Sequence, residues 1–208
     1  MRVLVACESS GRVREAFRRR GHEAWSCDLD PAEDGSEWHF QGDVRIMLCQ
    51  FEWDLVIAHP PCTRLANSGV RWMTDHWVKR QNGGNYWHDA TVNLVALIEA
   101  AALFNLFKGC APRVAIENPI PHRYARERIG EYTQIIQPWQ FWHRDTPGSG
   151  EQKATCLWLH NLPPLVPTTP NEWGRKQSCW LMSPGPSRTR ERSRTYLGIA
   201  DAMAAQWG

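Results

Sequence analysis

The stretch from Trp53 to Gly69, WDLVIAHPPCTRLANSG, decides the fold class. Its continuous apolar run, Leu55 to Ala58, is typical of a strand that is buried on both faces of a parallel sheet. Pro60 and Pro61 end the strand, because proline has no backbone N–H to donate to a sheet. Cys62 then stands at the carboxyl end of a central strand, where open α/β sheets bind their ligands. A thiol in that place is either a nucleophile or a buried structural cysteine, and this stretch alone leaves both open.

The rest of the first half alternates apolar strands with helical patterns, which predicts a parallel sheet with crossover helices. The second half is less regular, and the proline-rich stretch 161–187 is hardly compatible with a packed helix. Residues 63–86 show no stable periodicity, so we expect a long loop there. The expected strands are Arg2–Cys7, Glu23–Cys27, Arg113–Ile116, Tyr132–Gln137 and Ala154–His160. The expected helices are Gly11–Arg20, Asp89–Phe107 and Ile199–Trp207.

The composition of the 208 residues, 42% of them hydrophobic, predicts a single domain with a sizeable core. Seven cysteines without a CxxC pair indicate free thiols in a reducing cytoplasm. We expect no metal site, because the histidines and cysteines show no ligand spacing. We also expect no membrane association, since no apolar segment is long enough to span a bilayer. The net charge of +2 permits nucleic-acid binding without requiring it.

Twelve tryptophans are a large number for a chain of this length. We assign Trp25, Trp53 and Trp158 to the core, because they lie in or beside predicted strands. Aromatic side chains on loops either stack on nucleobases or hold down loops that lack other structure, and both explanations stay open. The tryptophans in polar or proline-rich stretches are Trp72, Trp77, Trp87, Trp173 and Trp180.

A second chemical group follows the strand that we expect to end at Ile116. Glu117 comes directly after it, so Glu117 and Cys62 are expected at the same edge of the sheet. A thiolate beside a carboxylic acid suits attack on a heteroaromatic ring whose nitrogen is protonated. A pyrimidine has that need: attack at C6 places charge on N3, and an acid at N3 makes C5 nucleophilic. Asn118 would orient the loop, which Pro119 stiffens.

Three carboxylates indicate a nucleotide at the same edge of the sheet. Asp28 and Asp30 lie about 20 residues beyond the turn at residues 6–11, the spacing at which an acidic side chain meets a ribose. Asp43 adds a carboxylate that suits an adenine amino group. Gly11 is the one glycine in that turn, so a plain strand–helix–strand unit is the alternative.

These motifs together resemble a known family, the DNA cytosine-5 methyltransferases, and in particular its small bacteriophage members. VLVACESSG (3–11), CDLDP (27–31) and GDV (42–44) resemble its cofactor motifs. HPPCTRLANSG (59–69) resembles its nucleophile motif, IENP (116–119) its glutamate motif, and SRTYLGIADAMAAQW (193–207) its final motif. An amino-group methyltransferase would carry Asp or Asn before the two prolines. His59 stands there, which favours methylation of carbon.

The resemblance implies a role for individual residues. The catalytic set would be Cys62 as the nucleophile at C6, Glu117 as the acid at N3, Asn118, and Lys153 as the remaining donor to the base O2. The residues of the S-adenosyl-L-methionine site would be Ala6, Cys7, Glu8, Gly11, Asp28, Leu29, Asp43, Val44, Pro60, Thr195 and Tyr196. The DNA contacts would be Arg64, Ser68, Arg71, Trp72, Arg80, Arg188, Arg190 and Arg192; the last three lie in an arginine cluster that is otherwise a solvated loop.

The resemblance implies an α/β protein with the Rossmann-like class I methyltransferase fold, a mostly parallel sheet with helices on both faces. Residues 1–208 would form one catalytic domain, with a catalytic loop at about 62–88 and a reduced recognition segment at about 161–194. The expected substrate is duplex DNA with a flipped cytosine in a short sequence context, in the cytoplasm of the host cell if a phage encodes the chain. RNA or a free deoxycytidine nucleotide as substrate, and a catalytically weak DNA-binding homologue, are the alternatives.

The chain departs from the family pattern in three places. Glu8 and Ser9 stand where the family has more glycine. Lys153 follows Gln152 where the family carries arginines. The family's large target-recognition domain has no counterpart, because only about 30 residues separate the last predicted strand from the final motif.

Overall fold

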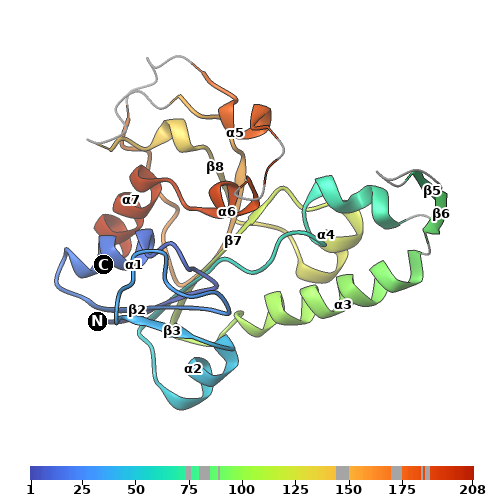
Figure 1. Ribbon diagram of the computed structural model, residues 1–208. Helices are drawn as coiled ribbons and strands as arrows, with labels where there is room; N and C mark the ends of the chain where they lie inside the picture. The colour runs from blue at the N-terminus through green and yellow to red at the C-terminus, as the bar shows by residue number, and fades with distance from the viewer. Residues whose placement is uncertain are drawn as a thin grey trace.

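A seven-stranded sheet forms the centre of the molecule (Figure 1). The computed structural model describes residues 1–73, 76–79, 85–88, 90–143, 150–169, 175–183, 185 and 188–208. The strands of the main sheet are β1 (Arg2–Ala6), β2 (Glu23–Asp28), β3 (His39–Gln41), β4 (Leu55–Ala58), β7 (Arg113–Pro119), β8 (Gln134–Ile136) and β9 (Thr155–His160). They lie in the order β3-β2-β1-β4-β7-β9-β8.

The direction of the strands defines the fold. Five strands run parallel to one another: β3, β2, β1, β4 and β7. β9 lies between β7 and β8 and is antiparallel to both. A parallel sheet with one antiparallel strand inserted beside its last strand is the topology of the Rossmann-like class I methyltransferase fold. The α/β fold class expected from the sequence is therefore confirmed.

Helices cover both faces of the sheet (Figure 1). The helices of one face are α1 (Arg12–Arg18) and α7 (Leu197–Trp207), which pack on alternate residues of β1 such as Val3 and Val5. The helices of the other face are α2 (Val44–Gln50), α3 (Ala90–Leu106) and α4 (Arg123–Ile129), which pack on Leu4 and Ala6. Successive strand residues point to opposite faces, so one short apolar run contributes to both cores.

The expected core and the main elements agree with the structure, apart from their ends. Trp53 and Trp158 are buried, and Trp25 is half-buried with its ring 5.0 Å from that of Trp38. β7 continues through Pro119 instead of ending at Ile116, because β9 pairs with its last three residues. Glu117 therefore lies within a strand and not after it, which corrects the expected boundary.

Short elements were not predicted. α2 and α4 are seven residues each, too short for a clear apolar period, and a side-chain cap begins each of them. Asp43 accepts a hydrogen bond from the backbone N–H of Arg45 (2.9 Å), and His122 accepts one from that of Ala125 (3.1 Å). Such caps stabilise a helix by satisfying the N–H groups of its first turn.

The expectation of an irregular loop at 63–86 is wrong in part. Its described residues include a 3₁₀ helix, η1 (Asn67–Met73), and an antiparallel hairpin of β5 (His76–Lys79) and β6 (Asn85–His88). Asp89, the expected first residue of the next helix, lies outside the described residues. Four-residue strands that pair only with each other give too short an alternation to predict. The hairpin lies at the far end of α3 from the sheet (Figure 1).

The C-terminal part contains η2 (Pro138–Gln140), α5 (Ser178–Leu181) and α6 (Arg188–Ser193). The expectation that 161–187 holds no packed helix is wrong at α5. The buried carboxylate of Glu151 accepts hydrogen bonds from the backbone N–H groups of Ser178 (3.2 Å) and Cys179 (2.8 Å). A distant side chain thus supplies the cap that the local sequence lacks.

Candidate active site

Cys62 lies in a tight turn after β4. Its carbonyl oxygen accepts hydrogen bonds from the backbone N–H groups of Leu65 (3.0 Å) and Ala66 (2.8 Å). The side chain of Leu65 is fully buried, and its carbonyl accepts from the N–H of His122 (3.1 Å). The loop after β4 is therefore tied to the segment after β7, and Cys62 is held at the edge where both strands run out.

Glu117 faces the same edge from the neighbouring strand. Ala58 of β4 lies opposite Ile116 of β7, so the next residues along the two strands, His59 and Glu117, are adjacent. His59 donates a hydrogen bond from Nδ1 to Glu117 Oε2 (3.2 Å). Burial raises the pKa of Glu117, but the hydrogen bond and charge of His59, the charge of Lys153 and a hydrogen bond from Thr155 outweigh it and lower that pKa. Glu117 is therefore a carboxylate at neutral pH.

The thiol of Cys62 is coupled to this carboxylate. Burial raises the pKa of Cys62, and the negative charge of Glu117 raises it further. The positive charges of Lys153 and Arg192 lower it. Cys62, Glu117 and Lys153, which are the predicted nucleophile, acid and donor, therefore lie close enough to shift one another's charge state. The raised pKa keeps the thiol mainly protonated at neutral pH.

Lys153 forms one wall of a pocket at Glu117. Its Nζ donates a hydrogen bond to the carbonyl of Arg192 (2.7 Å) and lies 5.8 Å from the ring centre of Tyr196. The pocket is lined by residues of β7, β9 and the final motif, among them Glu117, Lys153, Thr155, Thr195, Tyr196 and Met203. The C-terminal motif therefore closes over the carboxylate that β7 presents.

Asn118 is fully buried behind Glu117. Its Nδ2 donates to the carbonyl of Pro119 (2.6 Å), while its Oδ1 has no partner among the described residues. The amide thus holds the end of β7 rather than facing the pocket.

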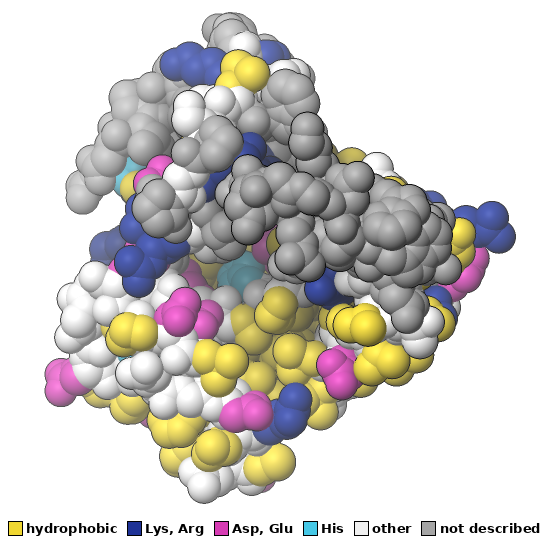
Figure 2. All heavy atoms as spheres, turned by 45° about the vertical axis from the view of Figure 1, so that its right-hand side comes forward, with side chains coloured by type: hydrophobic (Ala, Val, Ile, Leu, Met, Phe, Trp, Pro, Cys, Tyr) yellow, Lys and Arg dark blue, Asp and Glu magenta, His cyan; other side chains and the backbone are white. Residues whose placement is uncertain are grey.

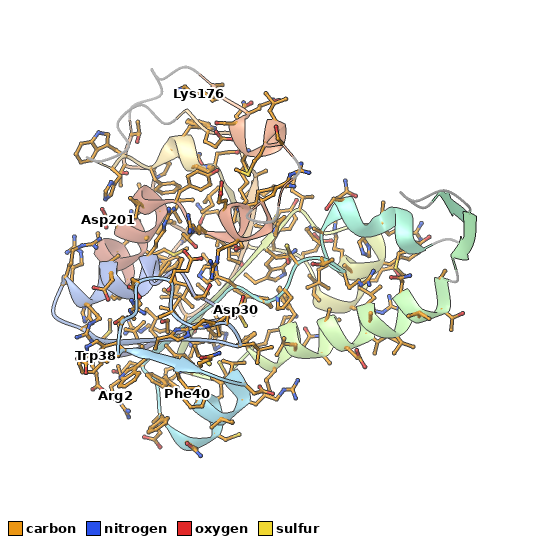
Figure 3. The ribbon with its side chains drawn as sticks, viewed as in Figure 1. Arg2, Asp30, Trp38, Phe40, Lys176 and Asp201 are labelled. Atoms are coloured by element: carbon orange, nitrogen blue, oxygen red, sulfur yellow. The ribbon has the colours of Figure 1, made fainter. Side chains whose placement is uncertain are left out.

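The candidate cofactor residues gather at the ends of β1, β2 and β3. Cys7 follows β1 with a left-handed backbone (φ 58°), rare for a residue other than glycine. Burial raises the pKa of its thiol to about 12, and the nearby charges of Asp28, Cys27 and Asp43 add to the shift. Asp28 accepts at Oδ1 from the backbone N–H of Asp30 (3.0 Å), a residue labelled in Figure 3 at the edge of the sheet where β2 ends. Leu29 beside it is 74% exposed, so an apolar surface flanks the carboxylate.

Glu8 and Gly11 build the turn into α1. Glu8 is buried, and its carboxylate accepts from the backbone N–H groups of Val13 (2.9 Å) and Arg14 (3.3 Å). Its side chain therefore caps α1, which Gly11 enters with a positive φ of 69°. A side chain on Gly11 would collide with the guanidinium of Arg14, so glycine is required there on both grounds.

The remaining predicted cofactor residues lie around this turn. Ala6 ends β1 and its carbonyl accepts from the N–H of His59 (2.9 Å), which places Pro60 beside the turn. Val44 is the buried first residue of α2. Thr195 and Tyr196 precede α7, and the carbonyl of Thr195 accepts from Arg12 Nη1 (2.9 Å).

The predicted DNA contacts are only partly described. Arg64 donates to Asn93 of α3, and Ser68 is exposed on η1. Arg71 and Trp72 lie on η1, but the placement of their side chains, and Arg80 altogether, fall outside the described residues. Of the loop tryptophans, Trp173 also falls outside, as do the side chains of Trp77, Trp87 and Trp180.

The arginine cluster at α6 is held by an acidic residue. Glu33 pairs with Arg190 (3.2 Å) and with Arg194 (2.7 Å). The charge of Arg192 acts on Cys62, and Arg188 Nε is buried without a partner among the described residues. On the face shown in Figure 2 the surface is hollowed near its centre, and Lys and Arg side chains border the hollow.

Sequence reasoning missed two residues of the site, His59 and Thr155. From the sequence, His59 counts only as the residue before the two prolines that favours methylation of carbon, and Thr155 only as part of the expected strand Ala154–His160. The signal for both was strand register, because each lies beside the end of β7. That register depends on which strands are neighbours, and the sequence does not state it.

No group of three or more His, Cys, Asp or Glu side chains within the described part of the chain is arranged to hold a metal ion. No helix in that part is both long and apolar enough to cross a membrane.

Known proteins were compared with the chain by sequence and by structure. No protein-family model matches it, and no curated protein sequence does. One similar solved structure is of a protein of E. coli described as a DNA modification methyltransferase encoded within a prophage (TM-score 0.40, 12% identity, 76% of this chain and 46% of that one). Others are the Entamoeba histolytica methyltransferase EhMeth (0.45, 11%, 89% and 60%) and the S. pombe Dnmt2 methyltransferase (0.38, 14%, 88% and 54%). The chain thus spans about half to three-fifths of the length of these proteins, and the fold assignment rests on the strand order and directions given above.

Proposed function

We propose that this chain is an S-adenosyl-L-methionine-dependent DNA cytosine-5 methyltransferase, a small member of that family of the phage type. The observation that carries the proposal is the proximity of Cys62, on the loop after β4, to Glu117 in the adjacent parallel strand β7 and to Lys153. Attack on a pyrimidine ring requires three groups close together: a nucleophile, an ionisable carboxyl group and a cation.

The residues divide the work as follows. Cys62 Sγ attacks C6 of the cytosine, N3 takes up a proton at the carboxyl group of Glu117, and the ammonium group of Lys153 faces the charge that develops on O2. C5 then becomes nucleophilic and takes the methyl group, after which the C5 proton leaves and the Sγ–C6 bond breaks. Asn118 keeps the end of β7 in place while Glu117 acts. Because the pKa of Cys62 is raised, the thiol must give up its proton before Sγ can bond to C6.

The donor set at the ends of β1 to β3 fits the proposed cofactor. The carboxylate of Asp28 suits a ribose diol, the exposed side chain of Leu29 an adenine face, and Asp43 the adenine amino group. The backbone of the turn from Ala6 to Gly11 would approach the methionine part. When bound, S-adenosyl-L-methionine supplies an electrophilic methyl group.

DNA is the proposed substrate, with the target cytosine flipped out of the duplex. The catalytic loop of about 62–88 would close over the base with Arg64, Ser68, Arg71, Trp72 and Arg80. The segment of about 161–194, with Arg188, Arg190 and Arg192, would contact phosphates. So small a recognition surface predicts a short context of one or two neighbouring bases, because each good bidentate contact to a base edge contributes only about 1–3 kcal/mol of discrimination.

Bisulfite sequencing of DNA from cells that express the wild type or the Cys62→Ser variant tests the proposal. We expect 5-methylcytosine with the wild type only, in a context of about two bases. In vitro, tritium transfer from labelled cofactor to duplex DNA, to RNA and to a deoxycytidine nucleotide identifies the substrate class. Transfer to RNA or nucleotide alone would overturn the DNA assignment, and no transfer to any of the three would overturn the enzymatic function.

A further inference from the structure

His59 is placed against Glu117 by the sheet itself. The parallel register of β4 and β7 makes the two residues neighbours, and the backbone N–H of His59 is held by the carbonyl of Ala6 (2.9 Å). Pro60 and Pro61 follow, so the chain has little freedom to turn the ring away. The side chain is 8% exposed, and Nδ1 lies 3.2 Å from Glu117 Oε2.

The stability of the fold does not explain this pair. His59 Nε2 is buried and has no hydrogen-bond partner among the described residues. A buried polar atom without a partner, and a buried ion pair, each destabilise a protein relative to an apolar side chain of the same size. A hydrophobic side chain at position 59 would therefore destabilise the fold less than the buried imidazole does. The imidazole is therefore better explained by its effect on Glu117.

We propose that His59 is the positioning residue for Glu117 and holds with it the single proton that the target base takes up. This inference rests on the proposed function. The hydrogen bond from Nδ1 engages Oε2 and so fixes the orientation of the carboxylate. An ionised Glu117 has no proton of its own to give, but an imidazolium–carboxylate pair has one.

The proton balance of the step is as follows. The Cys62 thiol first gives its proton to water. As Sγ then forms its bond to C6, the C5–C6 π electrons move to C4–C5 and those of C4–N3 move to N3. The proton passes from His59 Nδ1 through the carboxyl group of Glu117 to N3, which leaves a neutral imidazole and a carboxylate. The C4–C5 π electrons then form the bond from C5 to the methyl group, whose bond to its donor sulfur breaks, and the N3 lone pair restores the C4–N3 double bond. When the C5 proton has gone to water, its electrons restore C5–C6 as the Sγ–C6 bond breaks; the thiolate takes a proton back from water, and N3 returns its proton to the pair.

The charged groups around the pair set what a pH profile should show. Glu117 faces His59 from β7. Lys153, just before β9, lowers the pKa of Glu117, and Glu117 in turn raises the pKa of Cys156 in β9. Cys62 lies on the same loop as His59, and Glu117 raises its pKa. Arg192 acts on Cys62. Ionisation of Cys62 gives the rising limb of the rate with pH, and loss of the shared proton gives the falling limb.

The test compares His59→Asn, His59→Phe and the control His160→Asn, which removes an exposed histidine at the end of β9. The Asn amide can still donate to Glu117 but does not hold the proton. For His59→Asn we expect kcat at pH 7.5 to fall by about tenfold or more, KM for the cofactor to stay within about threefold, and the falling limb to move to lower pH, because Glu117 must then carry the proton alone. His59→Phe should lose more, and His160→Asn nothing. An unchanged pH profile in a folded His59→Asn variant overturns the proposal.

A readout without turnover separates the two proposals. In ¹⁵N-histidine-labelled protein, the hydrogen-bonded Nδ1–H of His59 should give a downfield proton signal that shifts upfield in Glu117→Ala, because its acceptor Oε2 is gone. An unshifted signal in a folded Glu117→Ala variant overturns the pairing, whether or not that variant is active. If the wild type transfers no methyl group to any substrate while the shift is present, the proposed function fails and the pair stands.

Discussion

Glu8 allows the energetics of the first turn to be tested directly. Its carboxylate accepts the N–H groups of Val13 (2.9 Å) and Arg14 (3.3 Å), and the hydroxyl of Ser10 donates to it (3.1 Å). Val13 and Arg14 are fully buried, so water does not replace the lost acceptor in a Glu8→Ala variant. Each unpaired donor costs about 1–3 kcal/mol, and the lost anion at the helix N-terminus adds about 0.3–1 kcal/mol.

The expected loss of unfolding free energy for Glu8→Ala is about 3–4 kcal/mol, since the longer bond to Arg14 lies at the weak end of that range. In a domain of this size that lowers Tm by about 6–16 °C. Glu8→Gln keeps one acceptor oxygen and should lose about 1–2 kcal/mol. The control Glu99→Ala, on the exposed side of α3, should change stability by no more than about 0.5 kcal/mol.

Urea unfolding followed by circular dichroism measures these differences, and a thermal melt checks their order. If Glu8→Ala unfolds within about 1 kcal/mol of the wild type, the carboxylate does not cap α1 and the reasoning about the turn is refuted. An equal loss in Glu8→Gln and Glu8→Ala would show that the charge, and not the number of acceptors, stabilises the helix.

Three further outcomes concern the site. Cys62→Ser should lose methyl transfer by several orders of magnitude and keep cofactor affinity within a few-fold, because a hydroxyl ionises far less readily than a thiol; near-normal tritium transfer would remove Cys62 from the mechanism. Alkylation of Cys62 by iodoacetamide, followed by mass spectrometry, should be slow at pH 7 and rise with pH, because the pKa is raised. Glu117→Gln should accelerate it by at least about threefold and Lys153→Met should slow it, whereas the opposite order would contradict the assigned charges. Asp28→Ala should weaken cofactor binding by about ten- to a hundredfold in calorimetry, with the exposed Glu99→Ala as the control, and unchanged affinity would refute its contact with the ribose.

The local sequence was sufficient where one run of residues determines one element. The apolar run 55–58 predicts β4 with its observed bounds, because a strand buried on both faces requires continuous hydrophobic side chains. The alternation of strands and helices in the first half likewise predicts the parallel sheet, and the two prolines predict where Cys62 must leave it. These are short-range requirements, so they can be read from neighbouring residues.

Other features depend on residues far apart in the chain. β9 inserts antiparallel beside β7 and extends it past Ile116, so Glu117 sits in a strand and meets His59 across the register. Glu151 caps α5 across 27 residues, and Glu33 holds Arg194 across 161. Hydrogen bonds and charges act over a few ångströms of space whatever the separation in sequence. The sequence alone therefore supplied the residues proposed to carry the chemistry, and only the tertiary structure decided which of them meet.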